Sequence, residues 1–371
     1  MRPAFRYYAL ELRRRLGHYT EKRLGGFEHH GSLESAAEAI LSKRAIDGFR
    51  AGGHFHGVWP RDLCFAARRL VAAGAGDELR TTTERLLERV VADDVFYTDV
   101  HDRFAAATPC EGVDTFPALV ILLDETGDVG PHDDLVADLA ALHRERFFDE
   151  GAGIVTGPGS SWWDSAADAR ETYDTAVLLA AVERLEARGV ETGYTGRSGE
   201  IRDGLATLWN GRFFDEHRGS SVLACDANVV PLYFGLVDDR RAERIVDSLA
   251  PLRTEHGLRM RERSFSLREV HPFFLLHRDY HGGIWPWNSF MYAAGLARYG
   301  YTGYAEGEVD RVERCLRPYG TFLETLDLDG TAYVKRGYAS AEDFTVAAAL
   351  WTEYRVRIGD PPAFVRRQSG R

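Results

Sequence analysis

Residues 285–300 read WPWNSFMYAAGLARYG, and this stretch combines two features that recur along the chain. It opens with a polar and aromatic cluster, Trp285-Pro286-Trp287-Asn288, and continues as a helical pattern that is apolar on most faces. A helix that is apolar all round is buried inside a protein. Gly300 stands where a helix end favours a left-handed residue. The stretch therefore predicts a buried helix whose first turn carries polar and aromatic side chains.

Helical periodicity extends over nearly all of the chain, and convincing strand patterns are few. Asp114-Thr115 before an apolar run is one of several typical helix starts. A preliminary helix is expected at about 4–23. Twelve further helices are expected at 33–45, 59–74, 76–92, 114–127, 132–149, 169–188, 195–214, 227–236, 239–252, 284–299, 302–317 and 341–357.

The twelve helices alternate in character. Every second helix is rich in Ala, Leu, Val and aromatic residues, as at 119–123 and 347–351. Several of the others, such as 76–92 and 239–252, are amphipathic and heavily charged. Buried and surface helices in alternation describe two concentric rings. We therefore expect an all-α (α/α)6 barrel in which residues 1–371 form a single domain, with 1–32 as an amino-terminal helical extension.

Polar and aromatic clusters begin the helices of the apolar set and recur about every 55 residues, a spacing that indicates repeated supersecondary units. If the inner helices run parallel, all the clusters open onto one end of the ring as a funnel. An irregular helical solenoid, whose aromatic residues only pack between repeats, is the alternative. The clusters are Trp59-Pro60-Arg61-Asp62, Asp114-Thr115, 170–174, Asp226-Ala227-Asn228, Trp285-Pro286-Trp287-Asn288 and 340–343.

Composition narrows the partners and the compartment. The chain has 371 residues, and its net charge of −11 argues against nucleic acid as a partner. The chain has no run of about 18 apolar residues, so no membrane span is predicted. Glu11 and the arginines at 13–15 come too early for a signal peptide. The four cysteines form neither a metal-binding nor a disulfide pattern, so we expect a cytoplasmic protein.

Most of the tryptophans belong to the expected funnel. Indole rings stack on the apolar face of a pyranose, while the sugar hydroxyls need a dense set of polar partners. Any single tryptophan at a helix start could equally be part of the core. As a group they favour a carbohydrate ligand. They are Trp59, Trp162, Trp163, Trp285 and Trp287, five of the seven in the chain.

Two carboxyl groups suit glycoside hydrolysis, which needs one on each side of the scissile bond. Asp164 follows Trp162-Trp163 in the loop before the helix at 169–188, and Glu324 lies in the loop before 341–357. Half a ring separates these loops, and a gap wide enough for a water molecule implies inversion. Alternatively, Asp164 is a helix cap, and Glu324 lies on an exposed arm beside the hairpin-like turn at 326–330.

Other polar residues of the clusters are candidates for binding the sugar. Arg61-Asp62 could clamp vicinal hydroxyls beside Trp59, or it could be a structural salt bridge. Asp226, Asn228 and Glu342 complete the binding candidates. Asp62, Asp226 and Glu342 are also rival carboxylates for either catalytic role. Because two carboxyls and water suffice for this chemistry, no metal or organic cofactor is required.

These clusters resemble motifs of the (α/α)6 glycosidases, which include glucoamylases, glycogen-debranching amylo-1,6-glucosidases, processing α-glucosidases and mannosylglycerate hydrolases. The resemblance covers roughly residues 50–355. It implies that Arg61 and Asp62 hold the non-reducing sugar, that Asp164 is the general acid and that Glu324 is the base. The matches are WPRD at 59–62 with W-x-R-D, GVDT at 112–115 with S-V-D-x-x-P, SWWD at 161–164 with T-W-M-D, GGIWPW at 282–287 with G-x-x-W-P-W, and SAEDFT at 340–345 with S-A-x-D-L-T.

The chain departs from that pattern in three places. Glucoamylases use a glutamate acid where this loop offers Asp164, and Val346 stands where they have a tryptophan after S-A-x-D-L-T. No β-sandwich domain precedes the ring, although some relatives complete their site with one. The funnel is therefore compatible with an open site or with one completed by a partner domain or subunit.

Three functional hypotheses follow. The leading one is an inverting exo-acting glycoside hydrolase for an α-glucoside or a small glycoside. The second is a sugar 2-epimerase or isomerase on the same double ring, in which histidines transfer protons. The third is a non-catalytic glycan-binding subunit. The histidines that keep the second hypothesis open are His54, His56, His271, His277 and His281.

Overall fold

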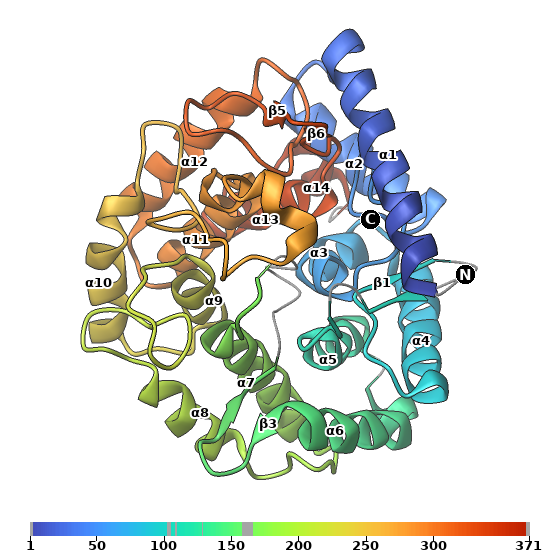
Figure 1. Ribbon diagram of the computed structural model, residues 1–371, viewed down its shortest axis with the longest axis vertical. Helices are drawn as coiled ribbons and strands as arrows, with labels where there is room; N and C mark the ends of the chain where they lie inside the picture. Colours follow the sequence, from blue (N-terminus) through green and yellow to red (C-terminus); the bar gives the residue numbers. More distant parts are fainter. Residues whose placement is uncertain (1–2, 102–104, 108–109, 128, 158–165, 369–371) are drawn as a thin grey trace.

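The computed structural model describes residues 3–101, 105–107, 110–127, 129–157 and 166–368. Within these ranges, six helices form an inner ring in which each helix packs against the next and the last packs against the first. Figure 1 shows several of these helices end-on around the centre. The inner helices are α3 (Pro60–Ala72), α5 (Thr115–Thr126), α7 (Glu171–Arg188), α9 (Asp226–Phe234), α11 (Pro286–Arg298) and α13 (Thr345–Arg357).

Six outer helices in the described part of the chain surround this ring, and the expected (α/α)6 barrel is confirmed. They are α2 (Leu33–Asp47), α4 (Gly76–Asp93), α6 (Asp133–Phe147), α8 (Ser198–Thr207), α10 (Asp239–Ser248) and α12 (Thr302–Leu316). The expected helix at 195–214 differs most, because the chain turns back after α8, where Trp209 pairs with Phe214 in an antiparallel bridge.

Burial follows the two patterns seen in the sequence. Every residue from Thr115 to Leu123 of α5 is buried, as expected for an inner helix that is covered on all sides. In α4 the buried residues are Leu79, Thr83, Leu86, Leu87 and Val90, which share one face. The charged remainder of α4 faces solvent, so the amphipathic pattern predicts an outer helix correctly.

The Trp-Pro pairs place an indole at the start of two inner helices. Pro60 and Pro286 occupy the first turn of α3 and α11, where a missing N–H is tolerated. A residue before proline is restricted to extended backbone. Trp59 and Trp285 accordingly have ψ angles of 108°, with φ of −103° and −106°. Each indole is therefore held outside the helix, at the entrance to the ring.

Short hairpins and 3₁₀ turns connect the helices. Three antiparallel pairs are described: β1 (Asp99–Val100) with β2 (Ala105–Ala106), β3 (Phe148–Asp149) with β4 (Ile154–Val155), and β5 (Val334–Lys335) with β6 (Tyr338–Ala339). The register of the last pair matches Val334 with Ala339. The 3₁₀ segments are η1 (Gly130–His132), η2 (Ala250–Leu252), η3 (Pro272–His277) and η4 (Tyr280–Gly282).

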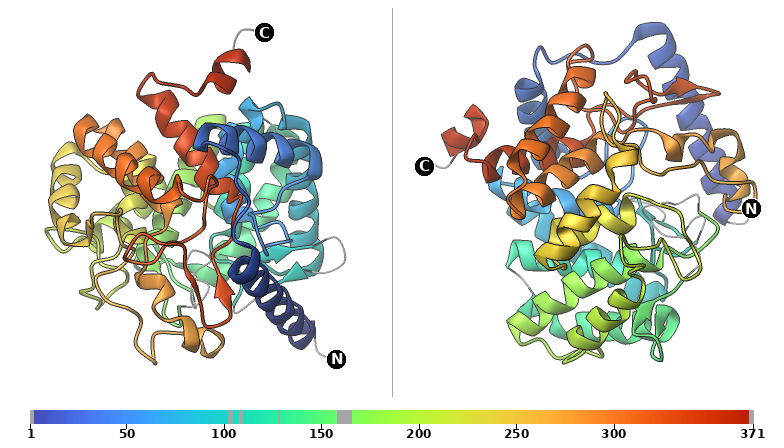
Figure 2. Two further views of the ribbon diagram at one scale, coloured as in Figure 1. Left: turned by 90° about the horizontal axis from the view of Figure 1, so that it is seen from above. Right: turned by 90° about the vertical axis from the view of Figure 1, so that its left-hand side faces the viewer.

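Helix α1 (Pro3–Gly25) confirms the expected helix at 4–23 and packs against the β5–β6 hairpin. His18 Nε2 lies 3.1 Å from the carbonyl oxygen of Ser340, and Lys22 forms an ion pair with Glu342. Figure 2 shows α1 running outward from the ring beside the red hairpin. The short carboxy-terminal helix α14 (Ala363–Gln368) was not expected from the sequence.

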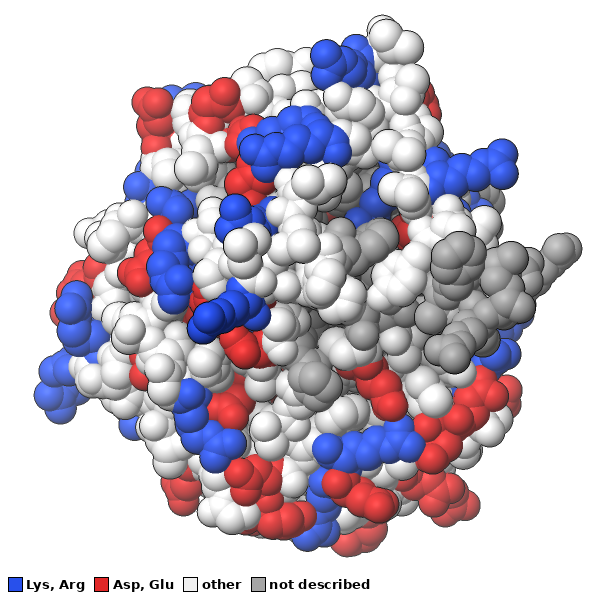
Figure 3. All heavy atoms as spheres, viewed as in Figure 1, with Lys and Arg blue, Asp and Glu red and all other residues white. Residues whose placement is uncertain are grey.

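Charges are mixed on the molecular surface. On the face seen in Figure 3, basic and acidic side chains of the described residues alternate around the rim. Arg218, for example, pairs with both Asp149 and Glu171. Among the helices that the structure describes, none combines the length and the apolar character needed to cross a bilayer.

Candidate active site

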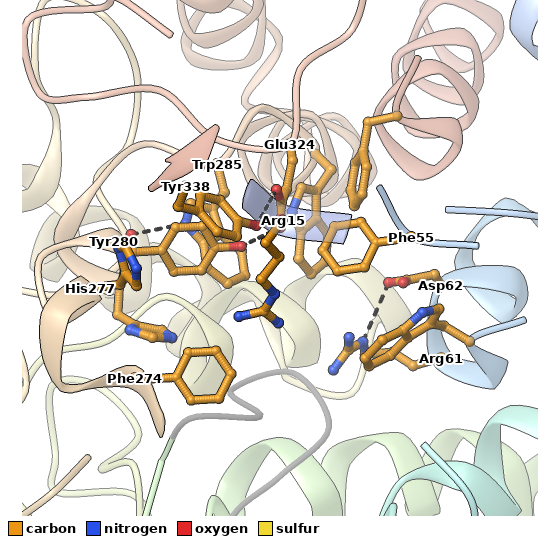
Figure 4. A pocket seen from close by; sticks show the side chains of 14 residues that line it. Arg15, Phe55, Arg61, Asp62, Phe274, His277, Tyr280, Trp285, Glu324 and Tyr338 are labelled. Atoms are coloured by element: carbon orange, nitrogen blue, oxygen red, sulfur yellow. Dashed lines mark hydrogen bonds and ion pairs between the residues drawn. The ribbon is translucent and has the colours of Figure 1, made fainter. Parts of the chain in front are cut away.

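A pocket lies at the end of the ring where the inner helices α3 and α11 begin (Figure 4). Its volume is about 650 Å³ when the open solvent at its mouth is included. The walls come from α1, α3, η3, η4, α11, β6 and the loops that contain Phe55, Glu324 and Phe344. The described residues that line it are Arg15, Phe55, Trp59, Arg61, Asp62, Phe274, His277, Tyr280, His281, Trp285, Trp287, Glu324, Tyr338 and Phe344.

Glu324 lies in the wall of this funnel pocket with its carboxylate fixed by three donors. Tyr280 donates its hydroxyl to Oε1, Tyr338 donates its hydroxyl to Oε2 at 2.7 Å, and the Ala341 amide donates to Oε2 at 3.2 Å. Burial raises the pKa of Glu324, while these hydrogen bonds and the charge of Arg15 act in the opposite direction. An oriented carboxylate with a raised pKa is suited to accepting a proton from water.

Arg61 and Asp62 face the pocket from the first turn of α3. Arg61 Nε lies 3.4 Å from Asp62 Oδ1, and its guanidinium carbon lies 5.8 Å from the centre of the Trp59 ring. Burial raises the pKa of Asp62, and the adjacent guanidinium lowers it. The pair thus presents a donor group and an acceptor group side by side, which is what vicinal sugar hydroxyls require.

Aromatic rings form the remaining wall. Trp285 and Trp287 have centroids 5.6 Å apart at an interplanar angle of 33°, and Trp285 donates its indole N–H to the Tyr280 carbonyl at 3.2 Å. Phe55 meets Trp59 edge-on at 5.7 Å. Rigid rings of this kind bind the apolar face of a pyranose without losing much side-chain entropy.

The structure thus brings six predicted residues together, whereas three others lie outside the pocket wall. Asp226 accepts hydrogen bonds from the buried Arg170 guanidinium at 2.8–2.9 Å. The Asn228 amide bonds the backbone of Phe214 and Ala224, and Glu342 binds Lys22 and the Glu28 amide. These three side chains tie segments of the protein together. The six in the wall are Trp59, Arg61, Asp62, Trp285, Trp287 and Glu324.

The other half of the predicted catalytic pair lies outside the described residues. Trp162, Trp163 and Asp164 fall in the segment 158–165. Their predicted roles therefore rest on the sequence. Among the described residues of the wall, the carboxylates are Asp62 and Glu324.

Six of the described wall residues were not predicted from the sequence, namely Arg15, Phe55, Phe274, Tyr280, Tyr338 and Phe344. Arg15 belongs to a basic run that is typical of a solvent-exposed helix, and Phe274 lies in an irregular connection. Tyr280 and Tyr338 hold Glu324 from two different segments, at distances of 44 and 14 residues along the chain. The local signals were the proximity of Tyr280 to the GGIWPW motif at 282–287 and of Tyr338 to the SAEDFT motif at 340–345.

Two of the five candidate histidines line the pocket. Burial lowers the pKa of His277 to about 4, and the charge of Arg15 acts in the same direction. Burial also lowers the pKa of His281 well below its usual range. Both rings are therefore neutral at neutral pH. His54 is buried behind Phe55, which stacks on it at 4.2 Å.

Two clusters of histidine and carboxylate groups lie outside the pocket. Within each cluster the atoms able to bind a metal lie within 4.8 Å of one another. Protein groups already pair with these side chains, because Arg14 donates to Glu11 at 3.1 Å and His101 lies 2.8 Å from Asp99. The contacts of the first cluster thus stay within α1 and within residues 99–101, whereas in the second His30 lies 2.8 Å from Asp343 and joins the 28–30 segment to the ring. The clusters are Glu11, Asp99 and His101, and Glu28, His30 and Asp343.

Solved structures share this architecture over most of the chain. A wild-type glycosidase superimposes with a TM-score of 0.68 at 16% identity, over 89% of this chain and 97% of its own. A GH63 mannosylglycerate hydrolase from Thermus thermophilus in complex with Tris gives 0.62 at 16%, over 86% and 99%. A bacterial glucoamylase complexed with acarbose gives 0.60 at 15%, over 91% of this chain and 57% of the longer enzyme. At such low identity these likenesses show the fold.

The amino-acid sequence itself indicates the class of enzyme. Residues 171–338, just under half of the chain, match the family described as a mannosylglycerate hydrolase MGH1-like glycoside hydrolase domain. No curated protein sequence matches the chain. The protein is a glycoside hydrolase built on an (α/α)6 barrel, and its substrate is a carbohydrate. Within that class, the segment that is similar to the mannosylglycerate hydrolase MGH1-like domain begins with α7 and contains Glu324.

Proposed function

We propose that the protein is an inverting, exo-acting glycoside hydrolase for small α-linked glycosides, with Glu324 as general base and Asp164 as general acid. The observation that carries this proposal is the position of Glu324. Its carboxylate faces the same aromatic pocket as the Arg61–Asp62 pair and is oriented by two tyrosine hydroxyls. A sugar held by Arg61 and Asp62 would present its anomeric carbon to a water molecule bound at Glu324.

The reaction then follows the two-carboxyl scheme for inversion. Glu324 takes a proton from the water as its oxygen attacks the anomeric carbon. Asp164 donates its proton to the glycosidic oxygen as the bond from that oxygen to the anomeric carbon breaks. The products are a sugar of inverted anomeric configuration and the free alcohol. Glu324 is left protonated and Asp164 ionised, and exchange with solvent restores both.

Asp62 is the rival for the acid role. It lines the pocket, and burial raises the pKa of its carboxyl, as a general acid requires. The pairing of Asp62 with Arg61 opposes that role, because the guanidinium favours the ionised carboxylate. The SWWD motif at 161–164 therefore makes Asp164 the preferred acid.

The substrate class is proposed from the pocket and from the names of similar proteins. The Arg61–Asp62 pair and the aromatic wall beside Glu324 suit one terminal sugar, as in a disaccharide or a small glycoside. Similar structures include a mannosylglycerate hydrolase, a glycosidase in complex with glucose and a glucoamylase. The test panel is therefore mannosylglycerate, maltose, trehalose and isomaltose, the last of which reports on debranching-type α-1,6 hydrolysis.

Proton NMR of the products is the primary test. We expect one member of the panel to release a sugar whose first anomer is opposite to that of the substrate. Asp164→Asn and Glu324→Gln should each lower kcat by about 100-fold or more, the usual contribution of a general acid or base. Asp168→Asn and Glu306→Gln, which alter exposed carboxylates, should leave kcat within about twofold of the wild type.

Two outcomes would contradict the assignment. Release of the retained anomer would exclude inversion. Near-normal turnover in Asp164→Asn together with a large loss in Asp62→Asn would move the acid role to Asp62.

The two neutral histidines in the pocket support isomerisation as a second candidate. Interconversion of a free monosaccharide, abolished by His281→Gln and retained in Glu324→Gln, would establish that reaction instead. For localisation, the buried thiols Cys64 and Cys225 support a reducing, cytoplasmic compartment.

A further inference from the structure

Helix α1 supplies one wall of the pocket. Its middle turn carries Arg15, whose side chain reaches into the pocket between Tyr338 and Phe274 (Figure 4). The guanidinium carbon lies 5.6 Å from the Tyr338 ring centre and 5.3 Å from that of Phe274. On the helix itself, Arg15 Nε lies 3.8 Å from Glu11 Oε2. Only 13% of the side chain is exposed, so the charge is held in a partly desolvated place.

Tyr338 connects Arg15 to the proposed base. The face of its ring carries the guanidinium, and its hydroxyl donates to Glu324 Oε2 at 2.7 Å. Tyr338 also belongs to β6, the strand against which α1 packs. The docking of α1 therefore fixes the distance between the guanidinium and the Glu324 carboxylate.

The other groups around Glu324 do not supply a comparable charge. Tyr280 from η4 and Tyr338 from β6 are neutral donors. His277 from η3 and His281 from η4 are neutral at neutral pH, because burial lowers their pKa. Arg61 on α3 is paired with its neighbour Asp62. Among the described wall residues, Arg15 is the cation that contacts a donor of Glu324, the ring of Tyr338, although it also lies near Glu11 on its own helix.

We propose that α1 completes the active site from within the chain, and that Arg15 is a positioning residue whose charge, held on the Tyr338 ring, adds to the hydrogen bonds from Tyr280, Tyr338 and Ala341 in favouring the ionised form of Glu324. The inference rests on the proposed function, in which Glu324 is the base. It also replaces the expected partner domain or subunit with a segment of the same chain. Burial alone would favour the protonated carboxyl, which cannot take a proton from water.

The pH dependence of kcat/KM tests the proposal, because its acidic limb reports the ionisation of the base in the free enzyme. Removing a positive charge favours the protonated form of Glu324, so the acidic limb should move to higher pH in Arg15→Met. We expect kcat/KM to fall by about tenfold at the acidic end and by less than about twofold at the alkaline end. Arg15→Lys keeps the charge, so the acidic limb of its kcat/KM profile should lie close to that of the wild type.

A matched control and a structural check accompany these variants. Arg13→Met removes an exposed arginine two residues away on the same helix and should leave the profile unchanged. Circular dichroism and thermal melting verify that α1 stays folded, since the contacts of His18 and Lys22 with the hairpin segment remain in all variants. A loss of rate in Arg15→Met that is equal at every pH would overturn the proposal, as would an unchanged profile.

A second measurement does not depend on turnover. The carboxylic acid band of Glu324 in infrared difference spectra is assigned by its absence in Glu324→Gln, and is then followed against pH. This band should persist to higher pH in Arg15→Met than in the wild type. If the wild type hydrolyses none of the substrates, the proposed function fails, and this titration alone decides the role of Arg15. Coincident titration curves would overturn that role.

Discussion

In the proposed mechanism, Glu324 is a buried carboxylate that acts as a base. Desolvation favours its protonated form, while two tyrosine hydroxyls and one backbone amide stabilise the ionised form. The same donors fix both carboxylate oxygens, so the direction from which Glu324 meets a water is set before substrate binds. Preorganisation of this kind avoids reorientation during the reaction.

Asp174 shows the opposite situation, a buried carboxyl without compensation. It is 1% exposed, and neither oxygen has a hydrogen-bond partner among the residues that the structure describes. Burial raises its pKa well above the usual range, and the nearby Asp114 acts in the same direction. A raised folded-state pKa means that stability falls as pH rises from the unfolded pKa towards the folded one.

The prediction concerns Asp174→Asn, which removes the ionisable group with little change in shape. The melting temperature of the variant should exceed that of the wild type by a few degrees at pH 8, and the difference should shrink as pH falls towards 4. Thermal melts across this range measure it. Asp138→Asn alters an exposed carboxyl and serves as the control. A difference in melting temperature that grows on acidification would contradict a raised pKa for Asp174.

Residue-level prediction from sequence succeeds where a side chain is placed by its own helix start. Trp59, Arg61 and Asp62 surround the first turn of α3, and their position follows from the Trp-Pro pair and the ring. Arg15 and Tyr338 reach the pocket only through the docking of α1 on a hairpin more than 300 residues away. No local pattern encodes such a contact.

At the level of elements, helix α8 packs so closely that one of its positions needs glycine, although helices usually favour alanine. Gly204 lies inside α8, where an added β-carbon would meet the Gly153 carbonyl oxygen at 2.1 Å and its carbon at 2.5 Å. Gly153 has a φ of +67° and belongs to the turn between β3 and β4. Both partners are backbone atoms, which cannot move away as a flexible side chain could. The glycine therefore allows α8 to approach the hairpin.

We predict that Gly204→Ala destabilises the protein by about 1–3 kcal/mol, the usual effect of overpacking. In an open helix position the same change stabilises by up to about 1 kcal/mol. Gly199 in the same helix has nothing within 4 Å of its ideal β-carbon, so Gly199→Ala is the matched control and should be neutral or stabilising. Chemical denaturation measures both variants. Equal effects would refute the packing argument.

Element prediction was most accurate for the longest periodic segments. All twelve barrel helices follow from periodicity because each is either covered on every side or has one clear apolar face. The two-residue strands and the 3₁₀ turns were missed, since segments so short carry no measurable period. Helix α8 was predicted too long because Trp209 and Phe214, which fit a helical pattern, instead pair across a turn.

For the whole molecule, a buried ionic network links three sectors of the ring. Arg170 at the start of α7 binds Asp226 of α9 and Glu216 of the preceding loop, and Arg261 also binds Glu216. Burial opposes ionisation of Glu216, but the two guanidiniums lower its pKa to about 2. Asp226 was predicted to bind sugar or to act in catalysis. Its partners in the structure give it a place in this network.

Removing one carboxylate should leave two buried arginines short of a counter-charge. Glu216→Gln is therefore expected to lower the free energy of unfolding by about 3–5 kcal/mol at neutral pH. A depressed pKa contributes stability above the unfolded pKa, so the difference should narrow as pH falls towards 2. The exposed Glu150, which pairs with Arg144 and Arg197, is the control, and Glu150→Gln should change the free energy by less than about 1 kcal/mol. Equal losses would argue against the network.

The contact between α13 and α3 also sets the order of events during synthesis. The ribosome completes α3 by residue 72 and begins α13 only at residue 345. Until then, the apolar side of α3 that α13 will cover stays exposed, and α1 waits for the hairpin at 334–339 on which it docks. A chain that stops before the hairpin and α13 has neither a closed ring nor a complete pocket wall. Activity should thus arise only once α13 has been synthesised, and the nascent chain that still lacks α13 is the stage at which molecular chaperones protect the most.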